Sequence, residues 1–409
     1  MPTIGVELSL DDVRAARDRI GHRVRRTPMI AAGELSRRVG TRTLLKAENL
    51  QLTGSFKVRG ALNRLSLMSE AERAAGVVAA SAGNHAQGLA FAARELGVQA
   101  TAVMPAGAPL AKVAAVKQYG GEVVLNEGSY EEAREAADEI ARRDGKIRVH
   151  AFDDPQVVAG QGTVGLEIAE DGPDVRLVVV PLGGGGLATG TAIAVKSLIP
   201  DARVIGVQAE ECAPYPASLA AHRAIGARSA NTICDGIAVK QPGELTLPLV
   251  ERWLDGVVTV TDDEAAEAMV LLLERSKLVV EGAGSVAVAA LMHGKVEAPP
   301  EGAVCAVLSG GNVDASLLAE CIRLGETARG RRIVLGTVVP DRPGALAGLL
   351  RIVADRGANV VDVEHLRDGV DLHVRETVIR LVLQTRGPEH DNEILGAVRA
   401  EGFSVKLEH

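Results

Sequence analysis

Short apolar runs alternate with alanine-rich stretches up to about residue 310. The stretches at 86–96 and 112–119 are rich in helix-forming residues, whereas the apolar runs are strand-length. Continuously apolar strands separated by helices are typical of a parallel sheet that is covered on both faces. The pattern therefore predicts an α/β fold, with strands at 76–80, 100–104, 122–125, 176–180, 204–207 and 303–308.

The pattern changes near residue 327. Residues 327–332 are polar and basic, which predicts a linker. The following segment predicts two helices and four strands, with a hairpin around Asp368 and Gly369 between the middle strands. This βαββαβ order over 333–409 indicates a small independent domain. Its expected strands are 333–338, 359–367, 374–385 and 403–407, and its expected helices are 345–356 and 390–400.

Composition limits the partners and the compartment that we expect. Hydrophobic residues make up 47% of the 409 positions and aromatic residues only 2%, so the core must form from aliphatic side chains. The formal net charge of -8 and the scattered basic residues argue against nucleic-acid and anionic-membrane partners. We expect no signal segment and no bilayer-spanning stretch. The cysteines form no Cys-x-x-Cys pair and indicate buried thiols of a cytoplasmic protein: Cys212, Cys234, Cys305 and Cys321.

Lys57 is the first residue with a pattern that suggests chemistry. A lone lysine in a polar segment is usually a solvated surface residue, because its ammonium group is costly to bury. Lys57, however, lies on a glycine-flanked turn beside Phe56 and just before an apolar stretch at 61–67. That context favours a partly desolvated amine with a lowered pKa, which could condense with a carbonyl group.

A run of four glycines predicts a phosphate site. The run follows the apolar strand at 177–180 and opens a helix at Ala188. Backbone N–H groups at a helix N-terminus form an anion cradle, and glycines let the backbone approach a phosphate closely. The spacing fits neither a dinucleotide fingerprint nor a P-loop, so a nucleotide is not expected. The residues are Gly183, Gly184, Gly185, Gly186 and Leu187.

Two other loops follow predicted strands. Residues 309–312 end a strand at the carboxyl edge, where doubly wound sheets bind ligands. Ser309 could hydrogen-bond a pyridine nitrogen without protonating it, or could be a simple loop serine. The second loop, residues 81–88, enters a helix, and its backbone N–H groups suit a substrate carboxylate. It contains Asn84, which could donate to a phenolic oxygen, and His85, which on its own is more often a packed residue than a base. Its candidate substrate-binding residues are Ser81, Ala82, Gly83, Asn84 and His85.

Together these loops resemble the fold type II pyridoxal-phosphate enzymes, most closely the threonine/serine dehydratases, also called threonine ammonia-lyases. Residues 55–60 look like the Schiff-base motif of that family, 81–88 like its substrate and cofactor loop, 183–187 like its phosphate loop and 309–312 like its pyridine-nitrogen motif. The motifs occur in the expected order over roughly residues 5–325. Further matches are 152–155, 160–163 and 281–284.

The resemblance implies an architecture and a cofactor. It implies a catalytic domain at 1–326 with two parallel-sheet subdomains, the smaller one at about 53–153. It also implies pyridoxal 5′-phosphate, with Lys57 as the catalytic residue. Some relatives bind a divalent cation in the region of Glu210, but the nearby carboxylate of that motif is replaced in 213–216, so we expect a solvated Glu210 and no metal. The cofactor-binding residues would be Phe56, Lys57, Asn84, Gly183, Gly184, Gly185, Gly186, Leu187 and Ser309.

The segment at 333–409 resembles an ACT regulatory domain. Such a domain implies a small effector, commonly an amino acid, and a homo-oligomer, either a dimer or a tetramer. The turn at 341–344 would bind the effector where it meets a neighbouring domain. A purely structural role in dimerisation remains the alternative. The implied effector residues are Asp341, Arg342, Pro343, Gly344 and Asn359.

The implied reaction is β-elimination of water from L-threonine, and from L-serine, giving a 2-oxo acid and ammonia. Val58 disfavours β-replacement chemistry, because related synthases carry Asp after the lysine. Ala82 disfavours racemisation, because serine racemases carry a second serine there. A dehydratase of 3-hydroxyaspartate or phenylserine, a serine racemase and a non-catalytic amino-acid sensor stay open as alternatives.

Overall fold

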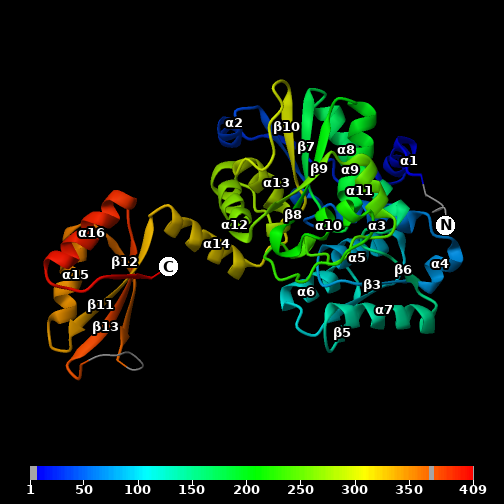
Figure 1. The fold of residues 1–409 in the computed structure, drawn as a ribbon. Helices are drawn as coiled ribbons and strands as arrows, with labels where there is room; N and C mark the ends of the chain where they lie inside the picture. The colour runs from blue at the N-terminus through cyan, green and yellow to red at the C-terminus, as the bar shows by residue number, and fades with distance from the viewer. Residues whose placement is uncertain (1–6, 368–372, 409) are drawn as a thin grey trace. The chain divides into compact units, whose positions relative to one another are not determined.

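The computed structural model describes residues 7–367 and 373–408, which form two compact units that divide between Asp314 and Ala315 (Figure 1). The division comes one helix earlier than the expected boundary at 326. Helix α14 (Ala315–Ala328) contacts strand β11 (Arg332–Pro340) of the second unit, so it belongs to that unit. Within the expected linker at 327–332, the first two residues belong to the end of α14 and the last to the start of β11, which leaves a turn at 329–331.

The larger sheet of the first unit has six strands in the order β1-β2-β10-β7-β8-β9. All neighbouring pairs are parallel except β1 with β2, which are antiparallel. Strands β2 and β10 are buried at every position, so both faces of the sheet centre are covered. The predicted parallel α/β fold is confirmed. The strands are β1 (Met29–Ala31), β2 (Thr43–Ala47), β7 (Val175–Pro181), β8 (Arg203–Ala209), β9 (Gly256–Val260) and β10 (Ala303–Leu308).

A smaller sheet of four parallel strands lies between β2 and β7 in the sequence, in the order β5-β4-β3-β6. Its helices include α3 (Lys57–Ser66) and α5 (Asn84–Leu96), which contact each other. Its strands are β3 (Val77–Ala80), β4 (Ala100–Pro105), β5 (Glu122–Asn126) and β6 (Ile147–Arg148).

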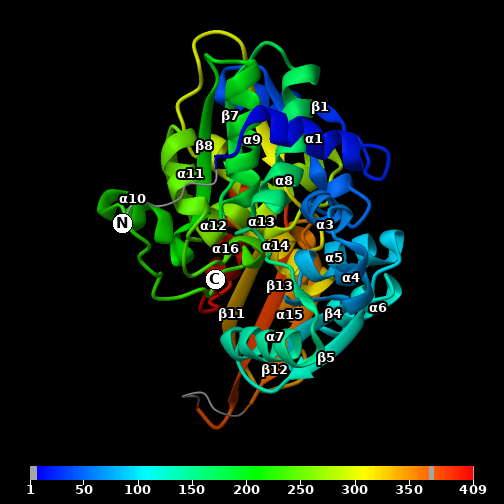
Figure 2. The same cartoon turned by 90° about the vertical axis from the view of Figure 1, so that its right-hand side faces the viewer.

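Helices α8 (Pro155–Asp171) and α9 (Gly186–Leu198) pack closely in front of β7 in Figure 2. Their glycines explain the close approach. A Cβ at Gly190 would overlap the carbonyl oxygen of Val158, and one at Gly165 would lie 2.6 Å from the oxygen of Thr191. Glycine is thus required on both sides of this contact.

The remaining helices of the first unit cover the two sheets. Among the residues described, no helix is long and apolar enough to cross a membrane. The α-helices are α1 (Leu10–Ile20), α2 (Gly33–Val39), α4 (Glu70–Ala75), α6 (Leu110–Gln118), α7 (Tyr130–Asp144), α10 (Pro214–Ala221), α11 (Thr246–Trp253), α12 (Asp262–Leu271) and α13 (Gly282–Met292). Short 3₁₀ helices occur at Glu48–Leu50, Glu210–Cys212 and Asp235–Ile237, and a π-helical turn at Leu272–Ser276.

The second unit has the predicted βαββαβ order after α14. Its antiparallel sheet has the order β12-β13-β11-β14, and its core is formed by the sheet and the two helices that follow β11 and β13. The expected hairpin at Asp368 and Gly369 lies outside the described residues. The elements after β11 are α15 (Ala345–Asp355), β12 (Asn359–Leu366), β13 (Glu376–Gln384), α16 (Pro388–Ala400) and β14 (Lys406–Glu408).

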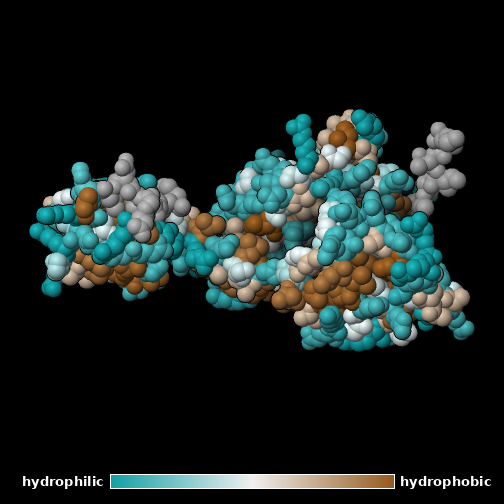
Figure 3. Space-filling view, turned by 90° about the horizontal axis from the view of Figure 1, so that it is seen from below, coloured by the Kyte–Doolittle hydropathy of each residue, from teal (hydrophilic) through white to brown (hydrophobic). Residues whose placement is uncertain are grey.

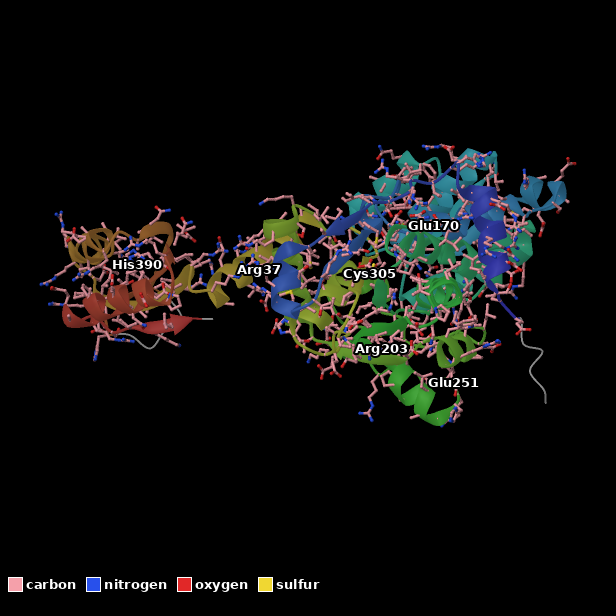
Figure 4. The ribbon with its side chains drawn as sticks, turned by 90° about the horizontal axis from the view of Figure 1, so that it is seen from above. Arg37, Glu170, Arg203, Glu251, Cys305 and His390 are labelled. Atoms are coloured by element: carbon pink, nitrogen blue, oxygen red, sulfur yellow. The ribbon has the colours of Figure 1, made fainter. Side chains whose placement is uncertain are left out.

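The four cysteines are all buried. In Figure 4, Cys305 lies inside the first unit, where it belongs to the central strand β10. Burial raises the pKa of the Cys305 thiol to about 12. These thiols therefore belong to the packed interior, as the sequence predicted.

A buried group of charges fixes helix α3 to its surroundings. Arg59 is fully buried and forms ion pairs with Glu48 (Nε–Oε2, 2.8 Å) and Glu167 (Nη1–Oε1, 2.7 Å). Lys46 adds a pair with Glu167 (2.6 Å). Burial by itself would raise the pKa of the Glu48 carboxyl, but the Arg59 guanidinium outweighs it and holds that pKa below its usual value. Four charges therefore compensate one another in the interior.

Replacing Arg59 with leucine should leave two buried carboxylates with only Lys46 as a counter-charge. We expect the free energy of unfolding to fall by about 3–5 kcal/mol, as for other broken buried ion pairs. Urea denaturation followed by circular dichroism measures the change. The exposed Arg14, paired with Asp11, is the matched control, and Arg14→Leu should cost no more than about 1 kcal/mol. Equal losses in the two variants would show that Arg59 is not needed to compensate the buried carboxylates.

Candidate active site

The predicted cofactor residues meet in one cavity of the first unit. Phe56, Lys57, Asn84, the glycine run and Ser309 all line it, although they come from four separate loops. The cavity lies at the carboxyl ends of β7 and β10, where ligands bind in α/β sheets. Its other lining residues are Ala151, Phe152, Gln161, Pro181, Gly236, Ile237, Glu281 and Ala283.

Lys57 begins helix α3 and directs its amine to the cavity. The Nζ atom donates a hydrogen bond to the carbonyl oxygen of Ala151 (3.0 Å) and lies 5.1 Å from the centre of the Phe56 ring. Burial lowers the pKa of Lys57 to about 8, and the Glu281 carboxyl only partly opposes this effect. An appreciable fraction of the amine is therefore neutral and nucleophilic near physiological pH.

Backbone hydrogen bonds join the lysine loop to the serine loop. Ser55 forms an antiparallel bridge with Gly310, and Phe56 N–H donates to the oxygen of Ser309 (3.1 Å). Ser309 is 3% exposed, and its hydroxyl has one long hydrogen bond, to the oxygen of Ala283 (3.4 Å). The hydroxyl can therefore turn to a ligand at small cost.

The glycine run forms the turn between β7 and α9. Gly185 is the N-cap of α9 with φ +97°, a conformation that favours glycine. A Cβ at Gly184 would overlap the Phe152 ring, and one at Gly183 would lie 2.9 Å from the Cα of Ile237. The N-terminus of a 13-residue helix behind such a loop is suited to bind a phosphate.

Tyr215 supports the glycine loop through a hydrogen bond to its backbone, a role that the sequence did not indicate. Its hydroxyl donates to the carbonyl oxygen of Gly184 (3.1 Å) and contacts the hydroxyl of Thr246 (3.4 Å). Burial raises the pKa of Tyr215, so its hydroxyl stays protonated as a donor. The bond turns the Gly184 carbonyl toward Tyr215, which leaves N–H groups for an anion.

Of the five candidate substrate residues, only Asn84 lines the cavity. Asn84 is the first residue of α5, and Gly83 is its N-cap. The Ser81 hydroxyl accepts a hydrogen bond from Gly83 N–H (3.2 Å), and Ala82 packs against a small apolar cluster. His85 is buried against the oxygen of Val149 (3.1 Å). Burial, together with the positive charge of Lys57, lowers the pKa of His85 to about 3, so His85 is a neutral packed residue.

Glu281 lines the cavity, although the sequence analysis noted it only as part of the matching segment 281–284 and gave it no role in the site. It is 5% exposed and precedes helix α13, whose residues from Gly282 to Leu291 are all buried. Burial and the nearby Asp235 raise the pKa of Glu281 to about 7, although a hydrogen bond from Asn84 opposes the rise. A charged residue directly before a helix of small and apolar residues was the available signal in the sequence.

The expected effector residues do not form one group within a chain. Gly344 has φ +90° and is the N-cap of α15, so the turn at 341–344 stands at a helix N-terminus. In the strand register, Asn359 of β12 and Arg332 of β11 both lie opposite Gln384 of β13, so Asn359 is level with the start of β11. The turn at 341–344 follows Pro340, which is the end of β11. Arg332 and Pro340 are eight residues apart on β11, roughly 27 Å at the strand rise per residue. Asn359 therefore lies at the opposite end of the sheet from the turn.

The residues of the cavity fit pyridoxal phosphate. They offer an amine with a lowered pKa, an anion cradle that a Cβ would fill, a buried hydroxyl and aromatic or apolar surfaces for a ring. Among the described residues, no cluster of three or more His, Cys, Asp or Glu side chains could hold a metal ion.

Known proteins resemble the chain over most of its length. The family described as pyridoxal-phosphate dependent enzyme matches residues 20–310, and the ACT domain matches 333–400. An L-threonine ammonia-lyase of Thermotoga maritima is 46% identical over 98% of this chain and 99% of its own length. A solved structure of a threonine deaminase from T.th. is 40% identical, with a TM-score of 0.71 over 75% of this chain and 99% of that chain. The structure of maize serine racemase is 32% identical, with a TM-score of 0.74 over 78% of this chain and 98% of that chain.

The fold is that of the fold type II enzymes, and the cavity combines a lysine amine with a glycine loop at a helix N-terminus. The chain belongs to the pyridoxal-phosphate dependent enzymes and carries an ACT domain in its second unit.

The lowered pKa of Lys57 predicts how cofactor uptake depends on pH. Only the neutral amine attacks a carbonyl, so the uptake rate of the cofactor-free enzyme should rise with pH, with a midpoint near 8. Visible absorbance after mixing with pyridoxal phosphate measures this rate. An N-acetyl-lysine amide, whose amine has a pKa of about 10.4, is the control. A midpoint equal to that of the control would show that the protein does not perturb Lys57.

Proposed function

We propose that the protein is a threonine ammonia-lyase, which removes water from L-threonine, and from L-serine, to give 2-oxobutanoate or pyruvate and ammonia. The observation that carries the proposal is that Lys57, the glycine run and Ser309 line one cavity. The choice of substrate is supported by the Thermotoga maritima L-threonine ammonia-lyase, which is similar along both units of this chain.

The residues of the cavity have distinct roles in this reaction. The N-terminus of α9 would hold the cofactor phosphate through its backbone N–H groups, and the Ser309 hydroxyl would bond the pyridine nitrogen without protonating it. The N-terminus of α5, beginning at Asn84, suits the substrate carboxylate. Bound pyridoxal phosphate supplies the electron sink for the charge that forms at the substrate Cα.

Lys57 moves the proton at the substrate Cα. Its amine has a pKa of about 8, so it can accept a proton when neutral and return one when charged. The same side chain holds the cofactor before substrate binds, which places the amine next to the reacting atom. The departing hydroxyl needs a proton, which Lys57 or the cofactor phosphate can supply.

Elimination is favoured over racemisation by Ala82. A racemase needs a second acid–base group besides the lysine. Ala82 stands where serine racemases carry a second serine, and its methyl group, which packs against a small apolar cluster, cannot transfer a proton. The common fold with maize serine racemase therefore does not require a common reaction.

The second unit supports control by a small effector. We propose that an amino acid such as isoleucine or valine binds at the turn 341–344, where α15 begins and its N-terminus can bind a carboxylate. Asp341 in this turn accepts a hydrogen bond from Arg367 (3.1 Å). Inhibition by isoleucine would fit a role in isoleucine biosynthesis.

We also propose a cytoplasmic homo-oligomer. Figure 3 shows a hydrophobic patch on the first unit that is surrounded by hydrophilic residues. Large apolar side chains of that unit are solvent-exposed, including Leu110 (86%) and Leu125 (53%). Exposed apolar patches commonly mark contacts between proteins.

The proposed reaction depends on the Lys57 amine. Lys57→Ala should abolish the visible band of the bound cofactor and reduce threonine turnover by at least about a thousand-fold, since both covalent binding and proton transfer are lost. A 2-oxo acid assay measures turnover with L-threonine, L-serine, 3-hydroxyaspartate and phenylserine. The exposed Lys117 on α6 is the matched control, and Lys117→Ala should behave as wild type.

L-Threonine should give the highest kcat/KM in this panel, and D-serine should not form from L-serine. A Lys57→Ala variant with normal turnover would remove the lysine from the mechanism. A preference for 3-hydroxyaspartate or phenylserine would replace the proposed substrate but keep the reaction.

Effector binding should depend on Gly344. Gly344→Val forces a β-branched residue into φ +90° at the N-cap of α15, so we expect at least about ten-fold weaker effector binding with unchanged basal turnover. Isothermal titration with isoleucine and valine measures binding. Gly348→Ala, inside α15 with open space around its Cβ, is the control. Unchanged affinity in Gly344→Val would place the effector elsewhere, and no binding to wild type would indicate a structural module.

A further inference from the structure

The side-chain amide of Asn84 is held from two sides by residues that are far away in the sequence. Its Nδ2 donates to Oε1 of Glu281 (2.7 Å), and its Oδ1 accepts from Nδ2 of Asn312 (2.7 Å). We propose that Glu281 and Asn312 are positioning residues, which fix the orientation of the Asn84 amide so that an N–H, and not the carbonyl oxygen, faces the cofactor. This inference rests on the cofactor site of the proposed function and does not depend on the substrate.

The orientation follows from the donors and acceptors involved. Asn312 cannot turn its own amide freely, because its Nδ2 also donates to the backbone oxygen of Thr53 (2.9 Å). Above its pKa of about 7, the Glu281 carboxyl is ionised and can only accept hydrogen bonds. A reversed Asn84 would therefore place oxygen against the Glu281 carboxylate and two N–H₂ groups against each other. Both contacts would be unfavourable, and both original hydrogen bonds would be lost.

The surroundings keep Glu281 in this position. Glu281 N–H donates to the oxygen of Gly310 (3.1 Å). A Cβ at Gly310 would overlap the Glu281 carboxylate. The glycine that follows Ser309 thus leaves room for a buried carboxylate next to the cavity. Burial of a carboxyl is costly, which is consistent with a role in function instead of stability.

Asn84 keeps one N–H that Glu281 does not accept. Because Asn84 lines the same cavity as Lys57 and Ser309, this N–H can be directed to an oxygen of the bound cofactor ring. A carbonyl oxygen in its place would repel the phenolic oxygen of pyridoxal phosphate. The clamp formed by Glu281 and Asn312 would then set both cofactor affinity and the electronic state of the ring.

A double-mutant cycle tests this inference with the full-length enzyme. Glu281→Gln keeps the shape, but its amide can donate as well as accept, so it no longer selects one orientation of Asn84. We expect pyridoxal phosphate to dissociate roughly ten-fold more readily and its visible absorbance maximum to shift. Measurements at about pH 9 keep Lys57 mostly neutral in every variant. Glu211→Gln removes the same charge at an exposed position, and this control should alter neither the cofactor dissociation nor the absorbance maximum.

In an Asn84→Ala background, Glu281→Gln should have little further effect on the cofactor affinity or the absorbance maximum, because Glu281 acts through Asn84. The same effect in both backgrounds would show that Glu281 acts directly on the cofactor and would overturn the proposal. A Glu281→Gln change with no effect in either background would also overturn the proposal. Thermal melting checks that each variant is folded, and Asn312→Ser replaces Glu281→Gln in the cycle if the latter does not fold. Threonine turnover is not used, so a wrong substrate would leave this result unaffected.

Discussion

The site depends on the backbone pairing between residues 54–56 and 309–311. Phe56 N–H donates to Ser309, and Gly311 N–H donates to Gly54 (2.8 Å). Through these bonds a loop beside the smaller sheet is joined to the end of the central strand β10 of the larger sheet. This pairing places the amine at position 57 and the hydroxyl at 309 in the wall of the same cavity. A side chain at Gly54 would overlap the Asn312 amide, which explains why the pairing needs glycine there.

The segment that begins with the pairing at 54–56 is also fixed a few residues later, at Arg59 in the first turn of helix α3. Successive residues on an α-helix are turned by about 100°, so Lys57 and Arg59 point to nearly opposite sides. One side faces the cavity, and the other enters the buried group of Glu48, Glu167 and Lys46. The first turn of α3 thus carries the reactive amine on one face and its anchor on the other. Position, more than stability, is what such a buried ionic group can provide.

Much of this arrangement could be predicted from the sequence, because its signals are local. Apolar runs identified strands β3, β4, β5, β7, β8 and β10, although the short strands β1, β2, β6 and β9 were not predicted. A glycine run after a strand predicted the phosphate loop. Residues such as Glu281, Tyr215 and Asn312 could not be assigned in this way, since their roles come from contacts between segments that are far apart in the chain. For the same reason the sequence analysis grouped Asn359 with the turn at 341–344 as effector residues. The strand register places them at opposite ends of the sheet, and register is set by contacts between distant segments. Such contacts also explain why the expected boundary at 326 differs from the division before α14, because a contact with β11 decides that question.

The buried thiols give the molecule internal reporters of motion. Cys305 lies in the central sheet, Cys234 precedes the turn at Asp235–Ile237 beside the cavity, and Cys321 belongs to α14 of the second unit. An alkylating reagent can reach such groups only when the surrounding structure opens. The order in which they react would therefore rank the opening of the sheet, the cavity wall and the second unit in a single experiment, without any added label.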